Sequence, residues 1–480
     1  MSLSSSRSSI FTSSNLFIPP MKRAGQRVYD AIVYSATGDT GSAAVRLLYH
    51  YAHNFNIKSW TMSARDIDKL ETNVLSALRG EGGVKWTGDP IKADSTDWES
   101  LLALCKQTKV VVACAGPYAK YGESIIAACI QTGTHYVDIT GETAWVNQMQ
   151  RRYNKAAKEA GVSVVSFCGY DSIPSDMSAF LLANGIRAEG DKADIVETYV
   201  ASKSAGGGAI PTGTTKTVLS MVNKVRYKYS FGLLGEAPEP KNTAVPAMED
   251  TGTRSSDGFL TDQVKKASKR DAAVDGKDFV SEILLDKPFK SSPHFMNQIN
   301  RPVVHATAEK LGFDFKYYER QVSGGKNAWD EGERATAGAA LISPWLGLVF
   351  APLVLTPFLD SAVLAYVRWY NGKDAETGSM HNVVQKLMNR GEGTGYVGMK
   401  GYAKGERTCA ESTFETDYEA GIGTTMLCAC AVAGALAGRK EKGNGFETPV
   451  VALGGEVLKE ALTQAGVRIT LQVAPIKSKL

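Results

Sequence analysis

Residues 28–41 read VYDAIVYSATGDTG, a nearly continuous apolar strand followed directly by a turn that contains glycine. The residues that follow, 42–52, have the apolar spacing of a helix. In a dinucleotide-binding turn, three glycines permit the strand exit, the approach of the pyrophosphate and the packing of the helix. Gly38 and Gly41 fill the second and third positions, and Ser35 stands at the first. We predict that Ser35 makes the turn with a negative φ and that the first helical turn binds a pyrophosphate.

The end of the second expected strand indicates which dinucleotide is bound. An acid there would bind the ribose 2′-hydroxyl of NAD, whereas Arg65 is a cation suited to the 2′-phosphate of NADP. NADP is therefore preferred over NAD, although Asp66 and Asp68 could hold Arg65 in a surface ion pair. Asp94, after the third strand, is a candidate for contact with adenine. The expected cofactor-binding residues are Ser35, Thr37, Gly38, Asp39, Thr40, Gly41, Arg65, Asp94, Ala115, Gly116 and Pro117.

Strands and helices alternate over residues 26–175, which we expect to form an NAD(P)-binding α/β domain with a doubly wound parallel sheet. The pattern changes after residue 176, and 176–440 is expected to be an α+β substrate and dimerisation domain. Residues 441–475 are expected to add a helix and a strand that pack back on the core. Six apolar strands are expected in the first domain, at 28–34, 58–64, 91–94, 109–115, 135–139 and 162–168.

Composition excludes several classes of function. The formal net charge of +4 arises from scattered Lys and Arg, so no basic stripe indicates a nucleic-acid partner. The seven cysteines show no CxxC spacing, and the histidines are dispersed, so we expect neither disulfides nor a metal site. No nucleophile elbow GxSxG occurs with a plausible partner, which disfavours hydrolysis.

Both ends of the chain suggest a cellular address. Residues 1–25 are Ser-rich and are expected to be disordered, with an organellar transit peptide as an alternative. The last three residues, Ser478-Lys479-Leu480, have the form read by the peroxisomal import receptor. We therefore expect a peroxisome or a peroxisome-derived organelle such as the glycosome.

Two internal segments depart from an ordinary globular pattern. Residues 235–280 are polar and irregular, which is typical of a surface insertion. Residues 335–359 carry no charge but contain Pro344, Pro352 and Pro357, so a straight membrane span is disfavoured. A broken hairpin in contact with a membrane surface and a buried helix pair or subunit interface are equally compatible with this segment.

Three polar runs follow strands of the first domain: CAGPYAKYGE (114–123), HYVDITGE (135–142) and FCGYDSIPSD (167–176). With SATGDTG, they resemble the saccharopine dehydrogenase-like oxidoreductases, whose usual forms are GATGFTG, AGR, VGPY with YGE, YVDITGE and GFDSIP. The resemblance is strong over 28–180 and loose over 393–475, and this chain departs from it at Ser35, Ser63 and Tyr170.

The resemblance implies an amino-terminal nucleotide domain, a second domain with a mixed sheet, and hydride transfer to or from NAD(P). Within that family, the sequence resembles the bacterial trans-acting enoyl reductases and the animal lipid-droplet members more than the lysine-pathway enzyme. We therefore expect a hydrophobic substrate such as an acyl or enoyl lipid, and a homodimer. A saccharopine-type amino-acid imine reductase and an inactive, membrane-associated nucleotide-binding scaffold are the alternatives.

Two side chains on these loops are candidates for catalysis. Tyr118 could donate a proton beside the hydride acceptor, or it could pack against the nicotinamide ring. Asp171 could orient the substrate, or it could serve in an Asx turn or as a helix cap.

Overall fold

The computed structural model describes residues 27–80, 86, 88–204, 280, 291–294, 296–322, 329 and 395–476. The serine-rich tail, the apolar segment 335–359 and the terminal tripeptide lie outside the described residues, as does the polar insertion apart from Val280.

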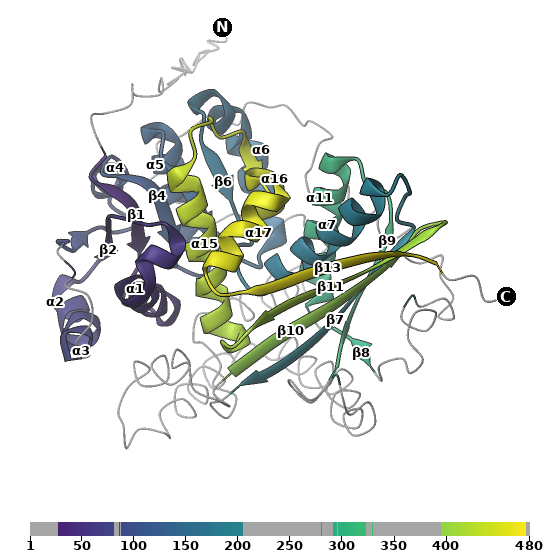
Figure 1. Ribbon diagram of the computed structural model, residues 1–480. Helices are drawn as coiled ribbons and strands as arrows, with labels where there is room; N and C mark the ends of the chain where they lie inside the picture. The colour runs from purple at the N-terminus through teal and green to yellow at the C-terminus, as the bar shows by residue number, and fades with distance from the viewer. Residues whose placement is uncertain are drawn as a thin grey trace, which may run out of the picture.

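The first sheet has seven parallel strands in the order β12-β6-β5-β4-β1-β2-β3 (Figure 1). This order confirms the predicted doubly wound sheet, with the reversal of strand order between β1 and β4. The six expected strands are all present, and β12 is a seventh that the sequence did not reveal. The strands are β1 (Tyr29–Tyr34), β2 (Trp60–Ala64), β3 (Ile91–Lys92), β4 (Thr108–Ala113), β5 (His135–Asp138), β6 (Ser163–Val165) and β12 (Gly445–Glu447).

Helices connect these strands, and two of them end where glycine allows a left-handed residue. Gly133 and Gly161 follow α5 and α6 with φ values of 69° and 66°, which an L side chain adopts only with strain. The connecting elements are α1 (Asp39–Tyr51), η1 (Ala52–Phe55), α2 (Ile67–Leu70), η2 (Glu71–Leu75), α3 (Ser76–Gly80), α4 (Trp98–Cys105), α5 (Tyr118–Thr132) and α6 (Thr143–Ala160).

The second sheet is mixed, in the order β13-β11-β10-β7-β9-β8, with β7 and β9 parallel and the other pairs antiparallel. Helices α7 (Ile173–Ala188) and α11 (Asn297–Leu311) pack together against it (Figure 1). The mixed sheet implied by the resemblance is thus present, whereas β11 was not expected. Its strands are β7 (Ile195–Ser204), β8 (Ser292–Pro293), β9 (Lys316–Gln321), β10 (Gly395–Lys404), β11 (Thr408–Thr416) and β13 (Arg468–Pro475).

Helix α15 (Thr425–Gly438) returns from the second sheet and packs on β1, β4 and β5, beside α1 (Figure 1). It continues the π-helical turn η5 (Ala420–Thr424). Among the described residues, 420–438 is the one helical stretch long and apolar enough to cross a membrane, but 83% of it is buried. Its small residues allow close contact, because a Cβ on Gly434 would lie 1.7 Å from the carbonyl oxygen of Phe55. In this fold α15 is therefore a core helix.

The chain then supplies elements to both sheets. After α15 it forms β12 in the parallel sheet, α16 (Pro449–Leu453) and α17 (Gly455–Gln464), and finally β13 in the mixed sheet. The single helix expected within residues 441–475 is wrong in one respect, since Gly454 with φ 80° divides it in two.

Candidate cofactor and substrate site

The turn after β1 has the left-handed backbone of a glycine turn, although a serine occupies it. Ser35 has φ 68°, so the expected negative φ is wrong. The turn is anchored to the neighbouring strand, because the Ala36 N–H donates to the Ser63 carbonyl at 2.9 Å. Hydrogen bonding to β2 therefore holds the chain in the geometry that the first glycine usually provides.

The two remaining glycines have different roles in this turn. A Cβ on Gly41 would lie 2.2 Å from the Ser35 carbonyl oxygen, so only glycine lets α1 pack against the strand exit. A Cβ on Gly38 would meet nothing nearer than 3.7 Å, so the protein itself leaves room there. The space at Gly38 and the donors of the first turn of α1 fit a pyrophosphate oxygen.

This turn lies at the reversal point of the parallel sheet. Tyr34 pairs with Ala113, so the segments that follow β1 and β4 leave the sheet side by side. The Cys114 N–H donates to the Tyr34 carbonyl at 3.0 Å, and Ala115, Gly116 and Pro117 continue from that edge. The structure thus brings the expected phosphate turn and the expected β4 loop together at the carboxyl edge of the parallel sheet, where doubly wound folds bind their ligands in a crevice.

The predicted selectivity residue Arg65 lies on the β2 side of this crevice. Its side chain is 81% exposed, and Nε lies 3.9 Å from Oδ2 of Asp94. Asp66 instead caps α2 by accepting from the Lys69 N–H. The alternative of a surface pair with Asp66 or Asp68 is thus not what the described residues show; Arg65 has a loose, solvent-exposed pair with Asp94, which a 2′-phosphate can displace at little cost.

Tyr118 begins α5 beneath the β4 loop and is buried. Its hydroxyl donates to the Ala113 carbonyl at 2.8 Å, and burial raises its pKa well above the usual value. The Glu142 carboxylate accepts from the Tyr118 and Ala119 N–H groups at 2.9 and 3.0 Å, which caps the helix with an anion. This geometry does not favour Tyr118 as a proton donor, and its ring lies beside that of Trp145 with the ring centres 5.8 Å apart.

Asp171 lies on the loop between β6 and α7 and is half-buried. Burial raises its pKa, the charge of His294 lowers it and that of Glu319 raises it, with the result at about 6. The N-cap of α7 is Ser172, so Asp171 is not the helix cap that we considered as an alternative. The position of a Cβ on Gly141 is 3.9 Å from Asp171 Oδ2, which places the carboxyl beside the loop after β5.

The sequence does not reveal the two side chains whose charges act on Asp171, His294 and Glu319. His294 precedes α11 and Glu319 lies in β9, and both are buried. Nothing local marks either residue, because both come from segments more than 100 residues beyond the Asp171 loop. In the described part of the chain, no group of three His, Cys, Asp or Glu side chains is arranged to hold a metal ion.

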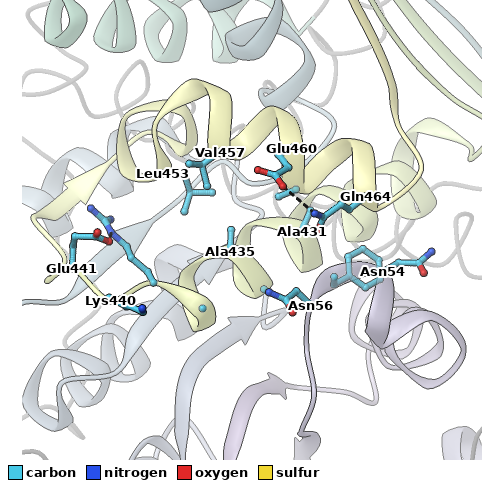
Figure 2. Close-up of a pocket in the computed structure, with 15 residues that line it drawn as sticks. Asn54, Asn56, Ala431, Ala435, Lys440, Glu441, Leu453, Val457, Glu460 and Gln464 are labelled. Carbon is cyan, nitrogen blue, oxygen red and sulfur yellow. Dashed lines mark hydrogen bonds and ion pairs between the residues drawn. The ribbon is translucent and has the colours of Figure 1, made fainter.

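A cavity of about 550 Å³ lies between η1, α15 and α17 (Figure 2). It is formed by η1, the C-terminal half of α15 and α17, beside the end of α1. Its polar lining residues include Asn54, Asn56, Lys440 and Glu460. Because α1 starts where β1 ends, this cavity lies toward the strand beginnings and is separate from the cofactor crevice.

Comparison with known proteins agrees with this geometry. Residues 36–165 match the family model of the saccharopine dehydrogenase NADP binding domain. A "Lipid droplet localized protein" of Caenorhabditis elegans is 35% identical over 40% of this chain and 44% of its own length. A "Trans-acting enoyl reductase" of Mycobacterium tuberculosis is 29% identical over 39% of this chain and 44% of its own length.

A "Probable mitochondrial saccharopine dehydrogenase-like oxidoreductase" of Arabidopsis thaliana is 30% identical over 47% of this chain and 50% of its own length. The chain therefore matches about half the length of these relatives, or less. The solved structure of an apo saccharopine dehydrogenase (L-Glu forming) of Saccharomyces cerevisiae can be superposed on this chain with a TM-score of 0.43 and 10% sequence identity. The match covers 92% of this chain and 99% of the other.

Proposed function

We propose that the protein, whose residues 36–165 match the family model of the saccharopine dehydrogenase NADP binding domain, is an NADP-dependent oxidoreductase that acts on a hydrophobic substrate. The observation that carries the proposal is the Ser35–Gly41 turn at the reversal point of the sheet. Gly41 packs without room for a Cβ there, while Gly38 leaves space for a ligand.

Each part of the crevice has a role in this proposal. The N–H groups of the first turn of α1 bind the pyrophosphate, and Arg65 binds the 2′-phosphate on the side of β2 and β3. The nicotinamide end then lies toward β4, β5 and β6. When bound, the cofactor supplies a hydride, and Asp171 holds the proton that completes reduction of the substrate.

The names of two relatives support a lipid-like substrate, because one is localised to lipid droplets and the other is an enoyl reductase. An acyl or enoyl compound is therefore the substrate that we propose. Reduction of an amino-acid imine, or cofactor binding without any turnover, would instead favour one of the two alternative functions.

The first experiment separates the role of Gly38 from that of Gly41. Gly38→Ala should fold normally and weaken NADPH binding by about tenfold or more, because the new methyl occupies the ligand's space. Gly41→Ala should destabilise the fold by about 1–3 kcal/mol through its contact with the Ser35 carbonyl. Urea unfolding and the fluorescence of bound NADPH measure the two effects.

A second experiment tests selectivity and substrate. Arg65→Ala should weaken NADPH binding about tenfold and leave NADH binding nearly unchanged. Asp94→Asn removes the anion that competes for Arg65 and should not weaken NADPH binding. NADPH oxidation is then followed with enoyl-thioester, carbonyl and imine panels. Equal loss of NADPH and NADH binding in Arg65→Ala, or no oxidation with any panel, would contradict the proposal.

We further propose that the Ser478-Lys479-Leu480 terminus delivers the protein to peroxisomes or glycosomes through the import receptor. The protein is also proposed to form a homodimer and to touch a membrane or lipid surface. An amino-terminal fluorescent fusion should enter the organelle and should lose that location when the last three residues are removed. Equal distribution of both fusions would refute the address.

A further inference from the structure

The N-terminus of α5, directly after the β4 loop, is closed by a side chain of the protein itself. The Tyr118 and Ala119 N–H groups donate to the two oxygens of the Glu142 carboxylate, at 2.9 and 3.0 Å. The next two N–H groups of the helix donate to the Pro117 carbonyl oxygen, both at 3.1 Å. A helix begins with four N–H groups that lack a partner within the helix. In α5, all four donate to an acceptor that the chain supplies.

The Glu142 carboxylate is fixed at this position. Its side chain is buried, and its own N–H donates to the Thr140 hydroxyl at 3.0 Å. The Thr140 N–H in turn donates to Oδ1 of Asp138, at the end of β5, at 3.1 Å. These bonds hold the loop after β5, so the carboxylate does not leave the helix unless the loop itself rearranges.

The same loop borders the other carboxyl group of the candidate site. A Cβ on Gly141, the residue before Glu142, would lie 3.9 Å from Oδ2 of Asp171 and 3.1 Å from Cδ1 of Ile299. In the proposed function the nicotinamide end lies toward β4, β5 and β6, so the reacting end of the substrate lies between the start of α5 and the Asp171 loop. Glu142 is therefore a neighbour of that reacting end.

A helix N-terminus of this length is well suited to bind a substrate anion, because its N–H groups and its dipole both favour negative charge. In α5 these donors are already bound to Glu142. A second negative charge placed beside a buried carboxylate is repelled strongly, since little water screens the two charges. The carbonyl of a neutral ester or thioester meets no such repulsion.

We propose that Glu142 is a specificity-determining residue that excludes substrates with a negative charge at the reacting end. This inference rests on the proposed hydride transfer. Glu142 takes no part in the chemical step, but it occupies the position at α5 that the carboxylate of an amino-acid imine would need. The proposed substrate is therefore narrowed to neutral enoyl or carbonyl compounds.

The first test needs no turnover. Glu142→Ala leaves two N–H groups without their acceptor, so acetate should bind in place of the side chain and raise the melting temperature more than sodium chloride of equal ionic strength. The wild type should show no such difference. Glu123→Ala is the matched control, because Glu123 also lies in α5 but bonds to Arg152 and Tyr153, away from the helix N-terminus.

A matched pair of substrates gives the second measurement. A trans-2-enoic acid and its methyl ester differ in charge at the reacting end. The ratio of kcat/KM for the acid to that for the ester should rise about tenfold or more in Glu142→Gln, which keeps the size of the side chain and removes its charge. Glu142→Asp keeps the charge and should keep the ratio, as should Glu123→Gln. Glu142→Gln also takes the place of Glu142→Ala in the acetate test if the alanine variant does not fold.

The outcomes separate this inference from the proposed function. If the wild type reduces the ester and the ratio in Glu142→Gln equals that of the wild type, the specificity role is refuted and the proposed function stands. The role is also refuted if acetate stabilises the Glu142 variant no more than sodium chloride does. If the wild type reduces no compound, the proposed function fails, whereas an acetate effect confined to the Glu142 variant still assigns the anion position of α5 to Glu142.

Discussion

At the scale of single residues, Ser35 adopts an unfavourable backbone conformation that its neighbours hold in place. A non-glycine residue in the left-handed region costs about 1–3 kcal/mol, and Ser35 has φ 68°. The bond from the Ala36 N–H to the Ser63 carbonyl of the adjacent strand holds the turn in this geometry. Sequence analysis predicted the turn but not the sign of φ, because the contact that decides it comes from a separate strand.

Replacing Ser35 by glycine should therefore stabilise the fold. We expect Ser35→Gly to raise the free energy of unfolding by about 1 kcal/mol, after the larger entropy of glycine in the unfolded chain offsets part of the relief. Urea unfolding measures the change. Ala36→Gly, at a buried position without positive φ, is the control and should destabilise. A Ser35→Gly variant that is less stable than the wild type would show that the serine side chain stabilises the turn.

Asp138, at the end of β5, should make the stability depend on pH. Burial is the largest influence on its pKa, which is raised to about 7, despite hydrogen bonds from the Thr140 N–H and the Ser166 hydroxyl. The folded protein therefore binds a proton that the unfolded chain releases near pH 4, so the contribution of Asp138 to stability is greatest at low pH and is lost as the pH rises from about 4 through 7.

Asp138→Asn should remove this contribution while keeping the shape of the side chain. The loss of stability between pH 4 and pH 8 should shrink by an amount on the order of 3 kcal/mol. Urea unfolding at several pH values measures it. Asp171→Asn is a useful comparison. The half-buried carboxyl of Asp171 has a pKa of about 6, so its removal should flatten the dependence of stability on pH less than removal of Asp138 does. Parallel curves for wild type and Asp138→Asn would contradict the assignment.

At the scale of elements, the composition of α15 matches its place against the parallel sheet. Gly434 allows contact with η1, whereas Gly438, one turn later, faces more open space with its nearest neighbour at 3.7 Å from a Cβ. Gly434→Ala should destabilise the protein by about 1–3 kcal/mol or more through overpacking against the Phe55 carbonyl. Gly438→Ala should be nearly neutral. Thermal and urea unfolding of the pair measure the difference, and equal stabilities would argue against close packing of α15.

Some elements are evident from the sequence and others are not, for physical reasons. The strands β1 and β4 are continuous apolar runs buried on both faces, so composition alone locates them. β12 is only Gly445–Glu447, too short to show a period, and it is specified by pairing with β6. β11 alternates in burial but contains mostly polar and small residues, so its strand character depends on β10 and β13.

At the scale of the whole molecule, the chain does not complete one sheet before it begins the other. Residues 27–175 form six strands of the parallel sheet, but the face beside α1 is covered by α15 and the outer edge is extended by β12. The buried cluster of this face joins residues such as Val33 and Val112 with Met426 and Val432. The part of the chain that contains the cofactor turn therefore depends on residues more than 300 positions later.

This arrangement predicts that the expected first domain does not fold alone. A fragment of residues 27–175 lacks α15, so it exposes the apolar face that buries Val33, Val112 and their neighbours, and its loss of burial exceeds the few kcal/mol by which domains are stable. We expect the fragment to be insoluble, or to give NMR amide signals with the narrow dispersion of an unfolded chain. Addition of NADPH should not restore its folding. Addition of residues 420–476 as a separate chain should restore dispersed signals, because this segment supplies both α15 and β12. If 27–175 alone gave a dispersed spectrum and bound NADPH, the parallel sheet would be an independent unit, and α15 would stabilise only the junction with the mixed sheet.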